Sequence, residues 1–250
     1  MLFCLCLMAA CGAGADTRQL TTAIRVGSIP SSARALLTAQ GTRLTAPGKE
    51  RLTIQAIVTD SKGSREVRLI WEAPGRFRYD DYSAGKTIAF DSRAVSSAVA
   101  GPSDTDLDMV ETLLSDGAEA FFENFQNGAP FRFLGRGFRD DDGTNPGYTG
   151  PFHDIYHVMV PLTFTKTKAS RWKMYYFDSR TRLLAKVRYL VSRNGASTDV
   201  TTVYSGWLKI DGEMVPGRIE RSEGGKPALS FVNKGAAFGA AVGDSLFSKP

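Results

Sequence analysis

Residues 68–81 read RLIWEAPGRFRYDD, and their pattern indicates a β-rich fold. Leu69 and Trp71 alternate with Arg68 and Glu72 on either side of them, and Phe77 and Tyr79 alternate with polar neighbours after a Pro-Gly break. A period of two with one polar face is typical of half-buried antiparallel strands. Pro-Gly is a turn signal, so the stretch predicts a β-hairpin.

The same alternation extends outward from this hairpin in both directions. A short helix is expected over 31–39, followed by strands through the region 51–100. Further strands are predicted at 131–134, 152–161, 171–177, 182–191, 199–210 and 213–221. Asp211-Gly212 predicts a type I′ turn that joins the last two into one hairpin. The fold expected is mainly β, with one large antiparallel sheet.

Residues 103–127 interrupt the strand pattern with helical spacing. Apolar residues recur at i, i+3 and i+7, at Leu107, Val110 and Leu114. A break at 115–117 precedes a second short helix that carries Phe121 and Phe122, and Asp116 followed by Glu119 resembles a capping box. The segment predicts two consecutive amphipathic helices inserted between strands.

Length and charge exclude several classes of protein. The chain has 250 residues, with 31 Lys and Arg against 26 Asp and Glu, so its net charge is +5. Basic and acidic residues are interspersed, so no basic block points to nucleic acid. No run of about 18 apolar residues predicts a membrane-spanning helix. We expect one β-rich domain over 16–250.

The cysteines indicate the cellular compartment. All three lie within the first eleven residues, where an apolar run at 2–10 is followed by small residues. This pattern predicts a secretory signal over 1–15. Two processing sites compete: cleavage after Ala15 releases a chain that starts at Asp16, whereas a lipobox-like Met8–Cys11 makes Cys11 a lipidated first residue.

Candidate catalytic and metal-binding motifs are weak. His153 and His157 are the only histidines, and on a strand they lie roughly 13 Å apart on one face, too far for one metal ion. The acidic run at 140–142 lacks the ligand spacing of a calcium loop. Nucleophile-elbow, dinucleotide-binding and phosphate-loop motifs are absent from the sequence. We expect no enzymatic activity, no metal and no cofactor.

Aromatic residues on nearly every predicted strand leave two alternatives open. They fill one large core, or they line an apolar cavity between a curved sheet and its helical cover.

Three segments resemble the outer-membrane lipoprotein carrier family (LolA/LolB-like). The stretch at 68–81 is similar to a family strand pair that turns through Pro-Gly. YYFDSRTRLLAKVRYLV at 175–191 resembles a late hairpin, and GWLKIDGEMVPGRIE at 206–220 resembles the closing hairpin. The order of signal, short helix, strands, helical insert and further strands also matches.

The resemblance implies an unclosed half-barrel, a single curved antiparallel sheet whose concave face is covered by helices. The implied ligand is a lipid or a lipoprotein acyl chain, bound without chemistry by a monomer in the periplasm or, if Cys11 is lipidated, on the outer membrane. The implied apolar site comprises Leu69, Trp71, Phe77, Tyr79, Leu107, Val110, Leu114, Phe121 and Phe122. The family also implies an arginine that latches the cover, for which the segment offers Arg68, Arg76 and Arg78. The alternative is an envelope scaffold with a filled core and no ligand.

Overall fold

The computed structural model describes residues 31–41, 47–72, 75–91, 95–97, 104–140, 145–161, 170–193 and 195–247. The predicted signal, both processing sites and Cys11 lie outside these residues. The helices are α1 (Ser31–Gln40), α2 (Asp104–Ser115), α3 (Ala118–Gln126) and the 3₁₀ turn η2 (Asp244–Leu246).

Strands make up most of the described chain. The first half carries β1 (Arg51–Asp60), β2 (Gly63–Glu72), β3 (Arg76–Asp81), β4 (Lys86–Phe90) and β5 (Val95–Ser97). The second half carries β6 (Phe131–Arg139), β7 (Phe152–Pro161), β8 (Ser170–Asp178), β9 (Leu184–Arg193), β10 (Ala196–Ser205), β11 (Leu208–Ile210), β12 (Glu213–Val215), β13 (Arg218–Glu223) and β14 (Lys226–Gly239).

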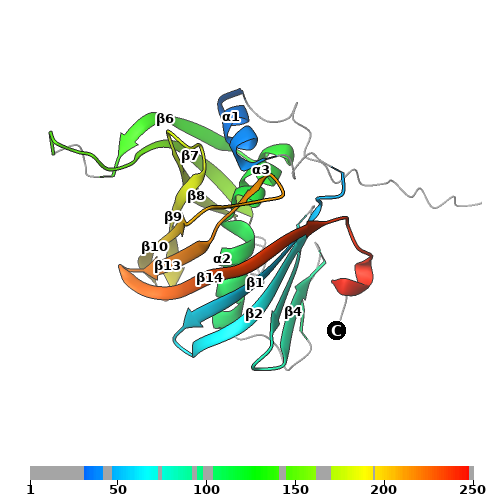
Figure 1. The fold of residues 1–250 in the computed structure, drawn as a ribbon. Coiled ribbons are helices and arrows are strands. Elements are labelled where there is room, and N and C mark those ends of the chain that lie inside the picture. Colours follow the sequence, from blue (N-terminus) through cyan, green and yellow to red (C-terminus); the bar gives the residue numbers. More distant parts are fainter. Residues whose placement is uncertain are drawn as a thin grey trace, which may run out of the picture.

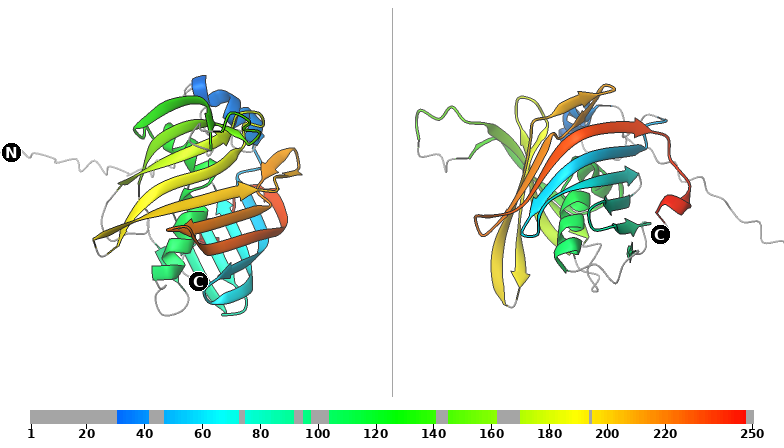
Figure 2. Two further views of the ribbon diagram at one scale, coloured as in Figure 1. Left: turned by 90° about the vertical axis from the view of Figure 1, so that its left-hand side faces the viewer. Right: turned by 60° about the horizontal axis from the view of Figure 1, so that its bottom comes forward.

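Twelve of the described strands form one antiparallel sheet in the order β5-β4-β3-β2-β1-β14-β13-β10-β9-β8-β7-β6. β14 therefore joins the two halves of the chain, because it pairs with β1 on one side and β13 on the other. The sheet curves strongly and stays open, with β5 and β6 as its edges (Figures 1 and 2). The predicted curved, unclosed antiparallel sheet is confirmed.

Alternation along each strand places one apolar row on the concave face. Leu69 pairs with Tyr79 and Trp71 with Phe77, and all four side chains are buried. α2 and α3 lie within the concavity (Figure 2), so that face becomes the core of the molecule. The helical insert is thus confirmed as a cover on the concave face. In the described part of the chain no helix combines the length and apolarity needed to cross a membrane.

One local prediction is confirmed with an interruption. The expected hairpin of 199–210 with 213–221 forms in a single register, with β10 paired to β13 and β11 to β12, but the pairing stops between the two and leaves β11 and β12 as a separate two-stranded sheet. The chain turns at Gly206, whose φ is +60°, and a Cβ at Gly217 would come within 2.3 Å of the Gly206 carbonyl oxygen. The type I′ prediction agrees with positive φ at both Asp211 and Gly212.

The predicted capping box, in contrast, is wrong. The N-cap of α3 is Gly117, which forms no side-chain cap. The Asp116 carboxylate instead binds Lys173 of β8. A tertiary ion pair has replaced the local hydrogen bond that the sequence predicts.

Candidate functional site

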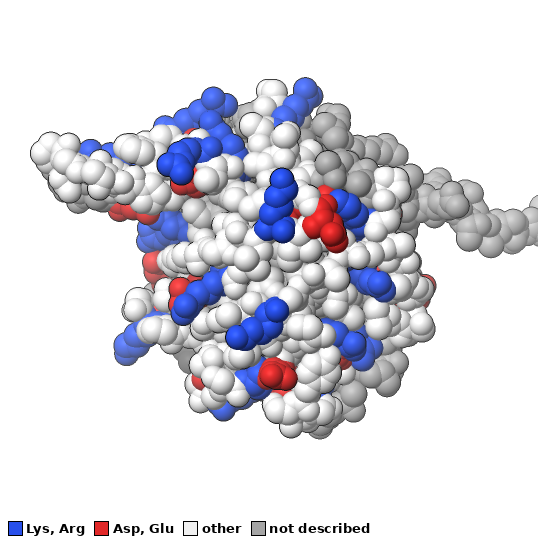
Figure 3. Space-filling model, in the orientation of Figure 1, with Lys and Arg blue, Asp and Glu red and all other residues white. Residues whose placement is uncertain are grey.

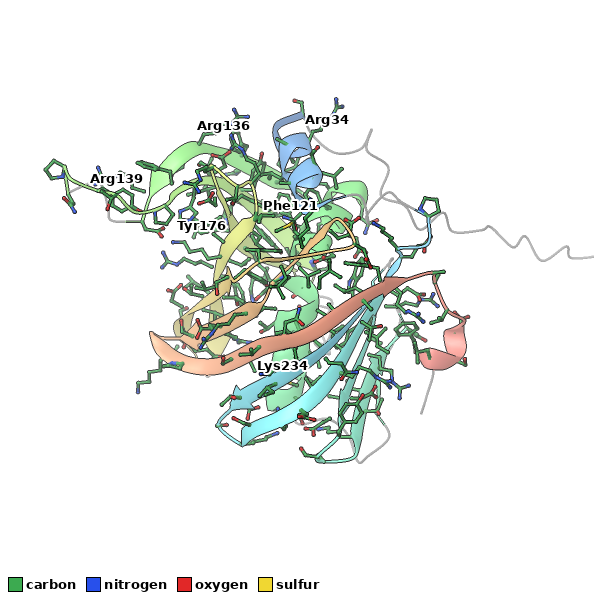
Figure 4. The ribbon with its side chains drawn as sticks, viewed as in Figure 1. Arg34, Phe121, Arg136, Arg139, Tyr176 and Lys234 are labelled. Atoms are coloured by element: carbon green, nitrogen blue, oxygen red, sulfur yellow. The ribbon has the colours of Figure 1, made fainter. Side chains whose placement is uncertain are left out.

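The concave face is an aromatic core closed by α2 and α3. Phe121 of α3 has no exposed surface and lies in the interior (Figure 4). Its ring centroid lies 4.7–5.4 Å from five other rings, those of Phe122, Phe125, Tyr156, Tyr175 and Phe177. Edge and tilted contacts at this spacing are favourable, so the second helix is held mainly by aromatic packing.

The apolar residues expected at a ligand site lie on both sides of this core. Leu69, Trp71, Phe77 and Tyr79 occupy the sheet side. The cover side contains half-buried Leu107, buried Val110, and Phe121 and Phe122. Leu114 belongs to α2, and its side chain is outside the described atoms.

A small void remains between the sheet and the cover. Its volume is about 60 Å³. The lining residues come from β1, β2, β3, the α2–α3 junction and the far strands, namely Leu52, Ile54, Leu69, Trp71, Phe77, Leu113, Gly117, Ala118, Glu119, Tyr204, Trp207, Pro216, Ile219 and Phe231. Pockets that enclose a drug-sized ligand measure roughly 300–1,000 Å³. In this conformation the concavity is too full to hold an acyl chain.

One polar atom in the lining of the void stands out. The indole Nε1 of Trp71 is buried and forms no hydrogen bond with the residues that the structure describes. A buried donor without a partner is unfavourable, and most such donors in proteins are satisfied. Trp71 could therefore donate to an oxygen of a molecule that entered the void.

A second, wider cleft lies beside the middle of α2. It has a volume of about 620 Å³ and opens to solvent between the β1–β2 turn and the β13–β14 hairpin. Met109 of α2 and Leu229 of β14 give it an apolar wall, and Asp60 and Glu223 lie at its polar side. This cleft has the volume of a ligand site but lies beside the predicted residues rather than among them.

The end of α2 is joined to the sheet by a buried polar cluster, which we call the latch: Ser115, Asp116, Lys173, Tyr175, Tyr189 and Thr202. The Lys173 ammonium lies 2.6 Å from an Asp116 carboxylate oxygen, and neither side chain is exposed. The hydroxyls of Tyr189 and Thr202 donate to the other carboxylate oxygen at 3.2 and 2.9 Å.

Two further bonds complete the latch. Lys173 also donates to the Ser115 hydroxyl at 2.7 Å, and the Tyr175 hydroxyl donates to the Ser115 carbonyl at 2.9 Å. Burial, followed by the charge of Asp116, raises the pKa of Tyr175 and of Tyr189 well above the usual range. Both phenols therefore remain protonated donors at any physiological pH.

Sequence reasoning did not identify the latch. Lys173 occupies the concave row of β8 with Tyr175 and Phe177, since it pairs with Val158 of β7. A lysine in an otherwise apolar row is a signal that a buried anion will be found opposite. The sequence does not indicate which carboxylate that will be.

The three arginines that the family resemblance offered for holding the cover form their hydrogen bonds and ion pairs elsewhere among the described residues. Arg68 and Arg78 bind Asp80, and Arg76 binds Glu72. The apolar row of the same strands faces inward, so alternation places these arginines on the convex face. This expectation is wrong.

Arg65 is the arginine of β2 that faces the cover. It pairs with Val58 in the concave row and lies 3.7 Å from the Met109 sulfur of α2. Its guanidinium is held by Asp60 at 2.8 Å and by Asp81 at 2.8 Å. Arg65 therefore contacts the first half of α2, whereas the latch holds the C-terminal end of this helix.

Other polar contacts attach the cover at its ends. Asp106 of α2 forms ion pairs with Lys62 and Lys86. Glu123 of α3 accepts a hydrogen bond from the Gly75 amide at 3.2 Å. Burial raises the pKa of Glu123 to about 7, although this hydrogen bond acts in the opposite direction.

The histidines do not form a site with each other. Both lie on β7, where His153 is 3.3 Å from Asp140 and the His157 ring packs against Trp172 in a tilted contact with 4.5 Å between ring centroids. Within the described ranges, no cluster of three His, Cys, Asp or Glu residues could hold a metal ion.

Three solved structures share this architecture. A LolA superfamily protein from Nitrosomonas europaea superposes with a TM-score of 0.56 at 13% identity, covering 87% of this chain and 97% of the other. A putative outer membrane lipoprotein-sorting protein domain from Vibrio parahaemolyticus gives 0.51 at 11% identity, with 86% and 95% covered. A DUF1329 family protein from Desulfovibrio piger gives 0.54 at 10% identity, with 86% and 94% covered.

No protein-family model and no curated protein matches the sequence. The chain therefore has the LolA-type fold, an open, curved sheet around a helical cover, at only 10–13% sequence identity to these structures. The resemblance noted from the three sequence segments is confirmed at the level of fold.

Proposed function

We propose that this protein is an exported, non-enzymatic carrier or acceptor of acyl chains, from lipids or lipoproteins, in the periplasm or at the outer membrane. The chains would lie on the concave face, between Leu69, Trp71, Phe77 and Tyr79 of the sheet and the residues of the cover. The observation that carries the proposal is the void beneath α2 and α3, whose lining includes Trp71, an indole donor with no partner among the described residues.

Binding would require the cover to move. The void of about 60 Å³ would have to widen severalfold, which means that α2 and α3 must separate from the sheet. Burying an acyl chain contributes about 0.8 kcal/mol per CH₂ group, so one long chain could offset the lost aromatic contacts. The acyl ester or carboxyl oxygen would accept the Trp71 hydrogen bond.

The nature of the latch supports a movable cover. Hydrogen bonds and one ion pair hold the end of α2, and such bonds can be replaced by water when the helix lifts. The adjacent wide cleft, walled by Met109 and Leu229, would give a chain its entry.

One observation favours a second function. The concavity is nearly filled by side chains, which is what an envelope scaffold or interaction module with no ligand requires. The two functions differ in whether the cover ever opens to a ligand.

The test is uptake of a fluorescent long-chain fatty acid by the exported chain. A carrier is expected to bind saturably, with one site per chain, and to show faster amide exchange in α2 when loaded. The pair Tyr189→Phe and Thr202→Val removes two bonds to Asp116 and should speed uptake severalfold. Tyr82→Phe, at an exposed tyrosine, is the matched control and should leave the rate unchanged.

Absence of binding by the unaltered chain and by the latch variant would overturn the carrier and favour the filled module. Native mass spectrometry of the same exported chain gives an independent measurement, because it reads any lipid adduct together with the N-terminus. A mass that starts at Asp16 with a lipid-sized adduct supports a soluble carrier. A diacylated mass that starts at Cys11 supports an anchored acceptor.

A further inference from the structure

Exposed apolar side chains gather at one edge of the sheet. Nine large hydrophobic residues are exposed in the described part of the chain, and five of them lie on β6 and the first residue of β7. We call these five, together with Arg132 and Arg136, the β6 patch: Phe131, Phe133, Leu134, Phe138 and Phe152. A cluster of this kind on an otherwise polar surface marks an interaction site.

The backbone explains why these side chains are not covered. β6 is an edge strand and pairs only with β7 among the described strands. Its register shifts twice, and Gly135 and Gly137 adopt φ of +137° and +70°. Bulges of this kind bend an edge strand away from its sheet. The β6–β7 hairpin accordingly projects from the molecule (Figure 1).

Both faces of the projecting strand carry aromatic side chains. Phe133 pairs with Tyr156 and so belongs to the concave row, whereas Phe138 pairs with His153 on the opposite face. A surface for a rigid protein partner normally presents one face. Aromatic side chains on both faces suit a medium that surrounds the hairpin, such as the headgroup region of a bilayer.

The charge of the patch is basic. Arg132 and Arg136 are exposed, and Phe131–Arg139 contains no acidic residue. Asp140, the next residue along the chain, is bound by Lys186. Figure 3 shows basic atoms along the upper side of the hairpin and acidic atoms along its lower side. Figure 4 shows Arg136 at this edge and Phe121 in the interior.

The patch is continuous with the cover. The Phe131 ring lies 4.7 Å from that of Phe125 on α3, and Phe125 lies 4.7 Å from Phe121 in the core. A surface that engaged Phe131 would therefore rest directly beside α3.

We propose that the β6 patch docks the protein on a bilayer surface that contains anionic phospholipids. The aromatic side chains would enter the headgroup region, and Arg132 and Arg136 would contact lipid phosphates. Docking does not depend on acyl-chain binding, because the patch is exposed whereas the void lies between the sheet and the cover. If the proposed function holds, docking would also bring the cover to the lipid.

The experiment measures partition of the chain to vesicles by flotation. Every variant carries Cys11→Ser, so that no lipid anchor at that position contributes. Leu134→Ser with Phe138→Ser is compared with Leu190→Ser and Leu208→Ser, a control pair of apolar residues elsewhere that are on average at least as exposed. The patch pair should reduce partition to phosphatidylglycerol vesicles by at least about tenfold, and the control pair by less than about twofold.

Charge is tested separately. Arg132→Gln with Arg136→Gln should lower partition to phosphatidylglycerol vesicles by about tenfold while leaving partition to phosphatidylcholine vesicles unchanged. Arg218→Gln, at an arginine on β13 that is 52% exposed, is the control and should have little effect.

The proposal would be overturned if the unaltered chain did not bind vesicles, or if patch and control variants lost binding equally. It would also be overturned if the patch variants abolished self-association through β6 while vesicle binding persisted. Fatty-acid uptake in solution should be the same in patch variants and unaltered chain. Failure of docking is thereby distinguished from failure of the carrier function.

Discussion

Lys173 in the middle of β8 and Asp116 at the end of α2 form an ion pair of 2.6 Å with no exposed surface on either side chain. The two residues are 57 positions apart in the chain. This pair connects the inserted helices to the second half of the sheet. It is the charged centre of the latch, so its loss should change both the stability of the protein and the mobility of the cover.

Breaking the pair from one side should be costly. We expect Lys173→Met to lower the free energy of unfolding by about 3–5 kcal/mol, because Asp116 remains buried without its counter-ion. Urea denaturation measures the change. Lys173→Met combined with Asp116→Leu should lower the free energy of unfolding clearly less, since no unpaired charge is left. Equal losses of stability in the single and double variants would contradict this prediction.

The carboxyl of Glu123 should make stability depend on pH. Burial raises its folded-state pKa from 4.5 to about 7, so the folded protein binds this proton more tightly than the unfolded chain. Its contribution to stability is therefore present below about 4.5 and is lost as pH rises through 7. Glu123→Gln should remove this loss, so the variant should gain stability over the unaltered protein between pH 5 and pH 8.

Thermal unfolding at the two pH values measures the Glu123 effect. Glu220→Gln, at an exposed carboxylate on β13, serves as the control and should show no such difference. A Glu123 variant whose stability relative to the unaltered protein is the same at both pH values would exclude a raised pKa.

Phe121 should be the most sensitive position of the cover. Phe121→Ala removes five ring contacts from a fully buried site and should lower the free energy of unfolding by about 3–5 kcal/mol. Phe138→Ala, at a phenylalanine that is 42% exposed, should change it by about 0.5 kcal/mol or less. Denaturant midpoints of the two variants compare them directly, and similar losses would mean that α3 is not part of the core.

The segment that follows β14, up to Phe247, should stabilise the fold by packing on the convex face of the sheet; we call it the clasp. Phe247 is 1% exposed and lies 4.9 Å from the Arg76 guanidinium, and the Val242 amide donates to Glu72 at 2.8 Å. Phe247→Ala should release the segment and lower stability by up to about 3 kcal/mol. Amide exchange at Val242 measures the release, and Phe247→Leu should largely prevent it. Unchanged protection of that amide in Phe247→Ala would contradict the clasp.

Local periodicity in the sequence predicted much of this structure. Alternation placed Leu69, Trp71, Phe77 and Tyr79 in one apolar row, and helical spacing located the cover at 103–127. Both patterns follow from backbone geometry, which repeats every two residues in a strand and every 3.6 in a helix. The same alternation predicts that Arg68, Arg76 and Arg78 face outward, in disagreement with the role that the family resemblance implied for one of them.

Contacts between distant segments were decided by the tertiary structure alone. The pairing of β14 with β1, the Lys173–Asp116 bond and the division of the last hairpin at Gly206 depend on surfaces that meet only after the chain has folded. A buried charge finds its partner through three-dimensional position, and position depends on the curvature of the whole sheet. The sequence by itself thus determined the elements and their apolar faces. The folded sheet determined how tightly the cover closes over them and which edge remains exposed.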